Sequence, residues 1–114
     1  MKYNMAQSRS IFIEVKDLVW KKINIDDITH IKEIGNSSLI YRSEGALIKS
    51  CKKMQDIQQA LPIEFERVHK AYIVNMHYVD TVCLKTNTIN MKFDCSIKIG
   101  IAHKKNIAKY MKIS

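Results

Sequence analysis

Apolar and polar residues alternate along most of the chain with a period of two, which is typical of β-strands with one buried face. The alternation is clear at 11–16 and resumes at 19–25 after the polar break Lys16-Asp17, so we interpret these two runs as a β-hairpin. Other short runs are rich in β-branched and aromatic residues and are separated by turn-forming residues. They predict strands at 30–34, 39–42, 46–51, 65–69, 72–75, 78–84, 88–93 and 96–101.

The period changes to that of a helix in two places. Between 53 and 61, apolar residues fall at positions i, i+3 and i+7, and Pro62 follows them. This pattern predicts one short amphipathic helix that ends at the proline. The last stretch, 104–112, places Ile107, Tyr110 and Met111 on one face and lysines on the other, which predicts a C-terminal helix with a basic surface.

The length and charge of the chain narrow the classes of function. At 114 residues, without a visible linker or repeat, we expect an N-terminal segment, 1–10, followed by one domain over 11–112. Nineteen basic residues against eleven acidic ones give a net charge of +8, which favours a polyanionic partner such as nucleic acid. Nine basic and two acidic residues lie in 67–114, so this part should supply most of the attraction.

Other functional classes leave no pattern in the sequence. Cys51, Cys83 and Cys95 are scattered, so neither a disulfide framework nor a zinc ribbon is expected. The histidines do not have metal-site spacing, and neither a nucleophile elbow nor a phosphate-binding glycine loop is present. We therefore expect no catalytic site, no metal and no cofactor. Because no run approaches the ~18 apolar residues of a membrane span, we also expect a cytoplasmic protein that is not inserted in a membrane.

The most distinctive stretch lies at 61–75 and reads LPIEFERVHKAYIVN. Its pattern predicts a strand, a turn of two or three residues that carries His69 and Lys70, and a second strand, with a cation at the hairpin tip. The run closely resembles the LytTR DNA-binding domain of bacterial transcription regulators. That family has Leu-Pro, then Phe-x-Arg-(Val/Ile)-His-Arg-Ser-Tyr-Ile-Val-Asn. The stretch at 25–33 is similar to the family's DI-x-x-I-E segment, and Gly35-Asn36 is similar to the loop that follows it.

The resemblance covers about 11–112 and implies a fold and a function. The implied fold is mainly β, an elongated antiparallel β-sandwich of short strands with one short internal helix and a C-terminal helix. The implied function is sequence-specific binding of double-stranded DNA by loops that enter the major groove, with two protomers forming a homodimer on direct repeats in promoters. The contact residues carried over from the family are Asn36, Ser37, Ser38, Lys70, His103 and Lys104.

The chain departs from the family pattern at three places. Lys70-Ala71 stands where the family usually has Arg-Ser, Ala102-His103 stands where it has Ser-Arg, and Gly100 occupies a common proline position. Two arginines that could contact a base through paired hydrogen bonds are therefore missing. These differences concern the DNA sequence that is read and the affinity, and they leave the expected fold unchanged.

Several residues in and near the motif have a structural interpretation. Asn75 follows a strand, where asparagine favours a turn, and we expect both Asn75 and Arg67 to support the fold rather than to face DNA. The aromatic side chains of Trp20, Phe65 and Tyr72 are expected in the core.

The leading interpretation is a stand-alone transcription regulator with no receiver domain in this chain, because 114 residues are the usual size of one domain. Met1-Lys2 resembles a natural start. The alternative is a protein-interaction module of the same fold with reduced DNA reading, which acts through a regulatory protein partner. A third class, a small β-barrel for single-stranded RNA, needs exposed aromatic residues on a sheet face, whereas the aromatics here mostly share the apolar phase. The sequence leaves open the operator, the regulated genes, the upstream signal and the choice between activation and repression. It also leaves open the oligomeric state without DNA and whether the chain is complete or part of a larger regulator.

Overall fold

The computed structural model describes residues 9–112, so most of the expected N-terminal segment, 1–10, lies outside the described residues. The chain divides into two compact units, 1–61 and 62–114, and each is described by itself. The expectation of one domain over 11–112 stays a prediction beside this division.

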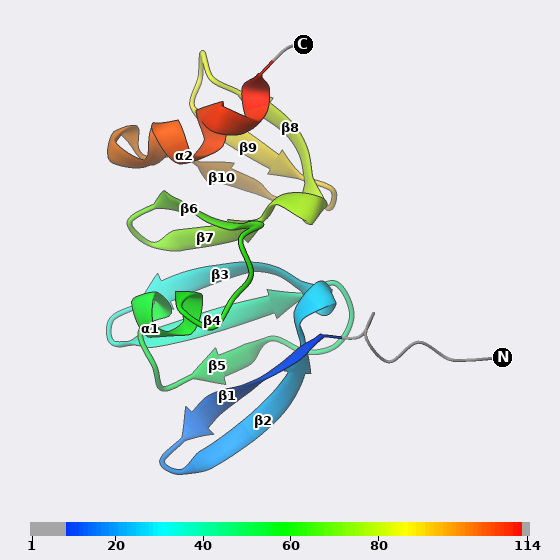
Figure 1. The fold of residues 1–114 in the computed structure, drawn as a ribbon, viewed down its shortest axis with the longest axis vertical. Helices are drawn as coiled ribbons and strands as arrows, with labels where there is room; N and C mark the ends of the chain where they lie inside the picture. The colour runs from blue at the N-terminus through cyan, green and yellow to red at the C-terminus, as the bar shows by residue number, and fades with distance from the viewer. Residues whose placement is uncertain (1–8, 113–114) are drawn as a thin grey trace, which may run out of the picture. The chain divides into compact units, whose positions relative to one another are not determined.

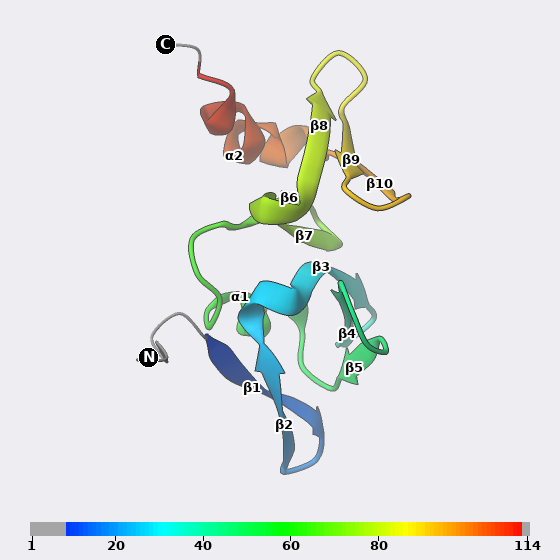
Figure 2. The same ribbon diagram turned by 90° about the vertical axis from the view of Figure 1, so that its right-hand side faces the viewer.

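The first unit begins with a long twisted hairpin (Figures 1 and 2). Its elements are β1 (Ser10–Lys16), β2 (Val19–Asn24), the 3-10 helix η2 (Ile25–Asp27), β3 (Ile28–Ile34), β4 (Ser37–Arg42), β5 (Ile48–Ser50) and α1 (Met54–Gln58). In the turn of the hairpin Leu18 has a φ of 60°, and the Glu14 carboxylate accepts a hydrogen bond of 2.8 Å from its backbone nitrogen. This bond stabilises a left-handed conformation that is otherwise rare for a leucine.

The strands that follow the hairpin are antiparallel, and within this unit β4 lies between β3 and β5. Gly35, with a φ of 58°, occupies the tight turn between β3 and β4. Isoleucines dominate the buried side chains. The buried hydrophobic residues of this unit are Ile13, Ile23, Ile25, Ile28, Ile31, Ile40, Ile48, Met54 and Ile57.

The second unit contains two antiparallel strand groups and the C-terminal helices. Its elements are β6 (Phe65–His69), β7 (Tyr72–Asn75), η3 (Met76–Tyr78), β8 (Val79–Cys83), β9 (Thr88–Met91), β10 (Ser96–Lys98), η4 (Ile101–His103), α2 (Lys104–Ala108) and η5 (Lys109–Met111). β6 and β7 form a hairpin, and β9 lies between β8 and β10.

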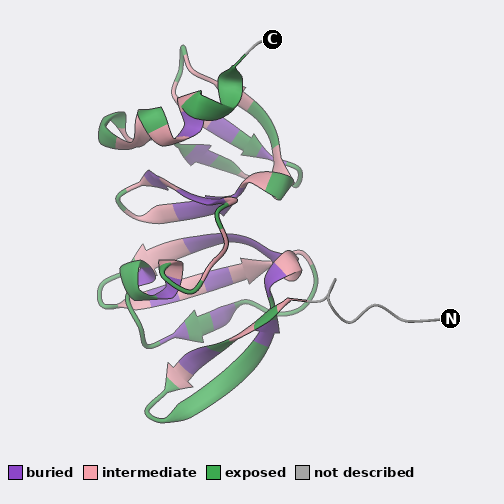
Figure 3. Cartoon of the chain, viewed as in Figure 1, coloured by how far each residue is buried: buried purple, intermediate pink, exposed green. Residues whose placement is uncertain are grey.

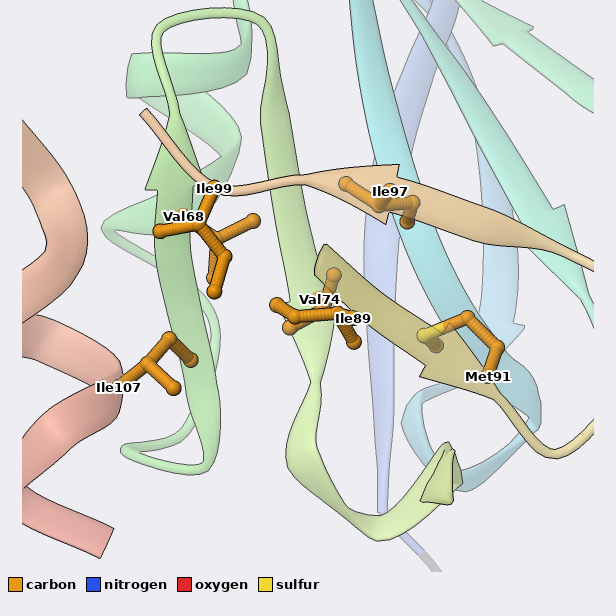
Figure 4. Packing of buried hydrophobic residues seen from close by; sticks show 7 residues of the cluster. All are labelled: Val68, Val74, Ile89, Met91, Ile97, Ile99 and Ile107. Carbon is orange, nitrogen blue, oxygen red and sulfur yellow. The ribbon is translucent and has the colours of Figure 1, made fainter. Parts of the chain in front are cut away.

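The core of the second unit joins these elements. Val68 from β6, Val74 from β7 and Ile107 from α2 are each 0% exposed, and they pack in one cluster with side chains of the β8–β10 sheet (Figure 4). The other buried members are Ile89, Met91, Ile97 and Ile99. Because α2 contributes a fully buried side chain, the last helix is held against the hairpin.

The mainly β fold with short antiparallel strands, a short internal helix and a C-terminal helix is confirmed. The internal helix, predicted over 53–61, is shorter and covers Met54–Gln58. The C-terminal helix, predicted over 104–112, divides into α2 and η5. The prediction that Trp20 belongs to the core is wrong, because its side chain is 52% exposed on β2.

Candidate nucleic-acid interface

Lys70 lies in the two-residue turn between β6 and β7, and its side chain is exposed. The Arg67 guanidinium holds this turn: Nε donates to the carbonyl oxygen of His69 at 3.0 Å, and Nη2 donates to the carbonyl oxygen of Lys70. The backbone nitrogen of Ala71 also donates to His69 Nδ1 at 3.1 Å. Three hydrogen bonds within five residues give the hairpin tip a defined conformation. The predicted tip is therefore present, with His69 at the end of β6 rather than in the turn.

The segment before α2 lies against β6. The backbone nitrogen of Gly100 donates to the carbonyl oxygen of Val68 at 2.7 Å, and Asn106 Nδ2 donates to that of Arg67 at 2.9 Å. Gly100 lies close to both the hairpin and η4, since a Cβ atom at this position would be 3.5 Å from the Cα of His69 and 3.5 Å from Cδ2 of His103. The hairpin and η4 thus bring the predicted residues Lys70 and His103 to one region of this unit.

The end of the C-terminal segment is anchored to the same strand. Glu66 on β6 accepts a hydrogen bond of 2.6 Å from the hydroxyl of Tyr110 and forms an ion pair of 2.9 Å with Lys109 Nζ. Burial, together with the neighbouring Glu66 carboxylate, raises the pKa of Tyr110 to about 12, so its hydroxyl remains a donor. These contacts limit movement of η5 relative to the hairpin.

His103 has a pKa below its ordinary value in the free chain. Burial is the largest cause, because it penalises the charged imidazolium, and the charges of Arg67, His69 and Lys105 act in the same direction. The side chain is half-buried at the end of η4. His103 is therefore mainly neutral at neutral pH until an anion approaches.

The two lysines that follow His103 differ in their surroundings. Lys104 is half-buried, and its Nζ donates to the carbonyl oxygen of Leu84 at 3.1 Å, while Lys105 is exposed. One bond leaves further donors on the Lys104 ammonium, so it can still contact an anion. Lys105 was missing from the predicted contacts, although it directly follows Lys104 in the sequence. We refer to Arg67, His69, Lys70, His103, Lys104 and Lys105 together as the cationic cluster.

The other predicted contacts belong to the first unit. Asn36 is exposed in the turn between β3 and β4, and Ser37 is half-buried. Ser38 differs from these two residues: it is 0% exposed, and its hydroxyl donates to the carbonyl oxygen of Lys52 at 2.7 Å, so the structure does not present it at the surface. The reason is strand geometry, because Ser38 shares the inward face of β4 with the buried Ile40.

Two residues with a predicted structural role have one. Asn75 is 1% exposed, and its Oδ1 accepts a hydrogen bond of 3.0 Å from the backbone nitrogen of His77 at the start of η3. Arg67 uses its guanidinium to hold the hairpin turn, as described above. Both residues lie in the motif at 61–75, so this motif determines the shape of the hairpin as well as its charge.

Residues 9–112 show neither a metal site nor a membrane-spanning helix. In this range no group of three or more His, Cys, Asp or Glu side chains is arranged to hold a metal ion. Over the same residues, no helix has the length and apolar character needed to cross a membrane.

Comparisons with known proteins give one family and one fold. A family model described as the LytTr DNA-binding domain matches residues 19–112. Among solved structures, the chain is similar to the LytTr DNA-binding domain of a methyl-accepting/DNA response regulator from Bacillus cereus, with a TM-score of 0.74 and 14% sequence identity. The similarity covers 91% of this chain and 97% of the other. The comparison with curated proteins finds no match.

Proposed function

The chain belongs to the LytTR DNA-binding domain family, and from this premise we propose that it is a transcription regulator that binds double-stranded DNA in a sequence-specific way through its cationic cluster. The observation that carries the proposal is the hairpin tip. An exposed lysine lies on a turn that Arg67 holds, beside a half-buried histidine and two further lysines. A rigid cationic loop can enter a groove of DNA without a large loss of conformational entropy.

The donors of the cluster suit the acceptors of a DNA duplex. The Lys70 ammonium can donate to phosphate oxygens or to O6 and N7 of guanine in the major groove. His103 and Lys104 would contact the same stretch of DNA from the η4 side. In the first unit, the exposed amide of Asn36 can pair with adenine, and the hydroxyl of Ser37 can bond to a base or a phosphate.

The family also supports two finer proposals. Binding as a homodimer on direct repeats would place one cationic cluster on each half-site and would increase the affinity through avidity. Action on promoter DNA would take place in the cytoplasm of a bacterial cell. Neither proposal involves a cofactor.

The Lys70→Ala variant tests the role of the hairpin tip. Arg67 donates to the backbone carbonyl of residue 70, so the substitution removes the ammonium and keeps the bond that shapes the turn. If Lys70 contacts a guanine, we expect a loss of about 1 to 3 kcal/mol that is confined to the specific site. A phosphate contact would instead weaken binding to all duplexes alike. Fluorescence anisotropy with a specific and a mixed-sequence duplex distinguishes the two.

Lys92→Ala is the matched control, because Lys92 is an exposed lysine of the same unit outside the cationic cluster. Both variants lose one positive charge, so any effect of net charge is shared. An equal loss of affinity in the two variants, with unchanged melting temperatures, would remove Lys70 from the interface.

A further inference from the structure

The outer edge of β2 is open in the described part of the chain. β2 pairs with β1 in a sheet that contains these two strands alone among residues 9–112. Five of the six residues of β2 are exposed, and Figure 3 colours the strand green along most of its length. A strand with one free edge can accept another strand by backbone hydrogen bonding.

The register shows which backbone groups of β2 face that edge. The Ile25 nitrogen donates to the Arg9 carbonyl at 2.8 Å, so the backbone N–H group of residue 25 points toward the segment that leads into β1. Hydrogen-bonded and non-hydrogen-bonded pairs alternate in antiparallel strands. Counting in steps of two from residue 25, the hydrogen-bonded pairs are Ile11–Ile23 and Ile13–Lys21. The backbone groups of Trp20 and Lys22 therefore point away from β1, toward the open edge.

Large apolar side chains are exposed on the same hairpin. Leu18 is 80% exposed, Phe12 62%, Trp20 52% and Val19 44%. Phe12 and Trp20 also line a groove of about 190 Å³, together with Ile57 and Ala60 of the α1 region. This volume is below the ~300 to 1,000 Å³ of typical small-molecule pockets and is suited to one or two apolar side chains of a protein partner.

The charges on the hairpin indicate what kind of strand would pair with β2. Lys16, Lys21 and Lys22 are exposed. Of the hairpin's carboxylates, Asp17 is exposed in the turn at the end of the strands, and Glu14 is engaged by Lys52 Nζ at 3.3 Å and by the backbone nitrogen of Leu18, so the lysines dominate along β2 itself. If a second copy added antiparallel along β2 in a register centred on Lys21 and Lys22, these lysines of the two copies would lie close to each other, and like charges across strands destabilise pairing. An acidic strand would place carboxylates opposite these lysines instead. The remaining carboxylate of the groove lining, Asp56, belongs to α1 and not to the edge strand.

We propose that β2 is a docking site for an extended, acidic segment of another protein, which adds as a strand along the open edge and inserts a large apolar side chain between Phe12 and Trp20. The family match begins at residue 19, so β1 and Phe12 precede the matched region. The site lies in the first unit, whereas the cationic cluster lies in the second. The proposal is independent of DNA binding, and its test contains no DNA in the first step.

Trp20 is the only tryptophan of the chain, so its fluorescence reports directly on the proposed site. The full chain is used to select peptides from a random phage-displayed library, and the enriched peptides are synthesised and titrated. We expect sequences in which acidic residues surround one or two large apolar residues. Their binding should shift the Trp20 emission to shorter wavelength, because the indole leaves water, and should protect the Lys22 amide from hydrogen exchange.

Charge reversal on the edge is the decisive variant. Lys21→Glu/Lys22→Glu keeps Trp20 as the reporter and should weaken peptide binding at least tenfold. Lys49→Glu, at an exposed lysine of β5 in the same unit, is the control and should leave binding unchanged. Circular dichroism and thermal melting check that both variants fold.

Four outcomes would overturn the proposal. The first is a library that yields no enriched acidic peptide. The second is an enriched peptide that binds the edge variant as well as the parent. The third is self-association in analytical ultracentrifugation that the edge variant abolishes, which would assign the edge to a second copy. In the fourth, duplex DNA shifts the Trp20 emission in the parent and not in the edge variant, which would assign the edge to nucleic acid.

Discussion

At the scale of single residues, His30 is a buried titratable group of the first unit. Its side chain is 8% exposed and stacks on Tyr41, with the ring centroids 4.2 Å apart and an interplanar angle of 6°. The hydroxyl of Thr29 lies 2.8 Å from His30 Nδ1. Burial lowers the pKa of His30 to about 4, so the ring is neutral in the folded chain at physiological pH.

This burial predicts that stability falls in mild acid. Between about pH 6.5 and 4, the unfolded chain protonates His30 and the folded chain does not, so protons favour unfolding. At pH 4.5 the contribution of His30 should lower the free energy of unfolding by about 2 to 3 kcal/mol relative to pH 7.5. Denaturant unfolding of the parent and of His30→Gln at both pH values measures it. The same decrease in both proteins would contradict the assignment, because other titrating groups are common to the two.

His103 should make DNA binding dependent on pH. Its pKa is lowered in the free chain, first by burial and then by the charges of Arg67, His69 and Lys105. A DNA phosphate beside the ring favours the imidazolium, so the complex has the higher pKa and takes up protons on forming. Affinity should therefore rise as pH falls from 8 toward about 6, and it should level off below the free-chain pKa, which lies under ~6.5.

Anisotropy titrations at several pH values, with the parent and His103→Gln, measure this effect. His69 and His77 are present in both proteins, so the difference between the two pH profiles belongs to His103. His103→Arg provides a permanent charge and should increase affinity most at pH 8, where the histidine carries least charge. Identical pH profiles for the parent and His103→Gln would exclude His103 as a contact that titrates on binding.

At the scale of elements, Gly100 connects η4 to the hairpin through its backbone. Its φ of −75° and ψ of 144° suit any residue, including proline, and its nitrogen donates to the Val68 carbonyl. A Cβ there would make ordinary van der Waals contacts of 3.5 Å or more. Gly100→Ala should therefore be neutral or stabilising by up to about 1 kcal/mol, since it restricts the unfolded chain.

Gly100→Pro should be the destabilising member of the pair. Proline fits the backbone angles and removes the N–H group, so the Val68 carbonyl loses its donor at a cost of about 1 to 3 kcal/mol. Thermal or urea unfolding of the two variants separates the effect of the hydrogen bond from that of the side chain. A proline variant as stable as the alanine variant would show that this bond does not hold η4 in place.

The elements with strong turn signals were predictable from the sequence. The predicted strands 65–69 and 72–75 coincide with β6 and β7, because a polar two-residue turn separates two apolar runs. The strands predicted at 46–51 and 96–101 are shorter, since β5 and β10 end where their pairing with β4 and β9 stops. Periodicity marks apolar runs but not where a neighbouring strand ends.

The short 3-10 helices and one aromatic residue were missed for local reasons. Asn24 and Asn75 each accept a hydrogen bond from the backbone two residues ahead and start η2 and η3, a feature that a period of two or 3.6 does not register. Trp20 is out of phase with the buried Ile23 on the same strand, so the alternation itself contained the signal that Trp20 faces outward. The prediction of a core position rested on the apolar character of tryptophan and not on its place in the alternation of the strand.

At the scale of the whole molecule, most of the excess positive charge lies in the C-terminal part of the chain. Residues 67–114 carry nine basic and two acidic side chains, and the cationic cluster lies within this range. The position of Lys70 at a turn was predictable from the motif. Three features of the site required the structure because they depend on packing: the hydrogen bonds from Arg67 to the turn, the burial of Ser38 and the contact of Gly100 with His69 and His103.

Selection of bound duplexes from a random DNA pool tests the central claim, that this chain reads the sequence of double-stranded DNA. The full chain is incubated with the pool, bound duplexes are recovered over several rounds, and the recovered sequences are aligned. We predict enrichment of a short motif that occurs as a direct repeat, and a weaker enrichment with Lys70→Ala than with Lys92→Ala. A pool that stays unenriched would contradict the claim and would favour a protein-interaction module of the same fold.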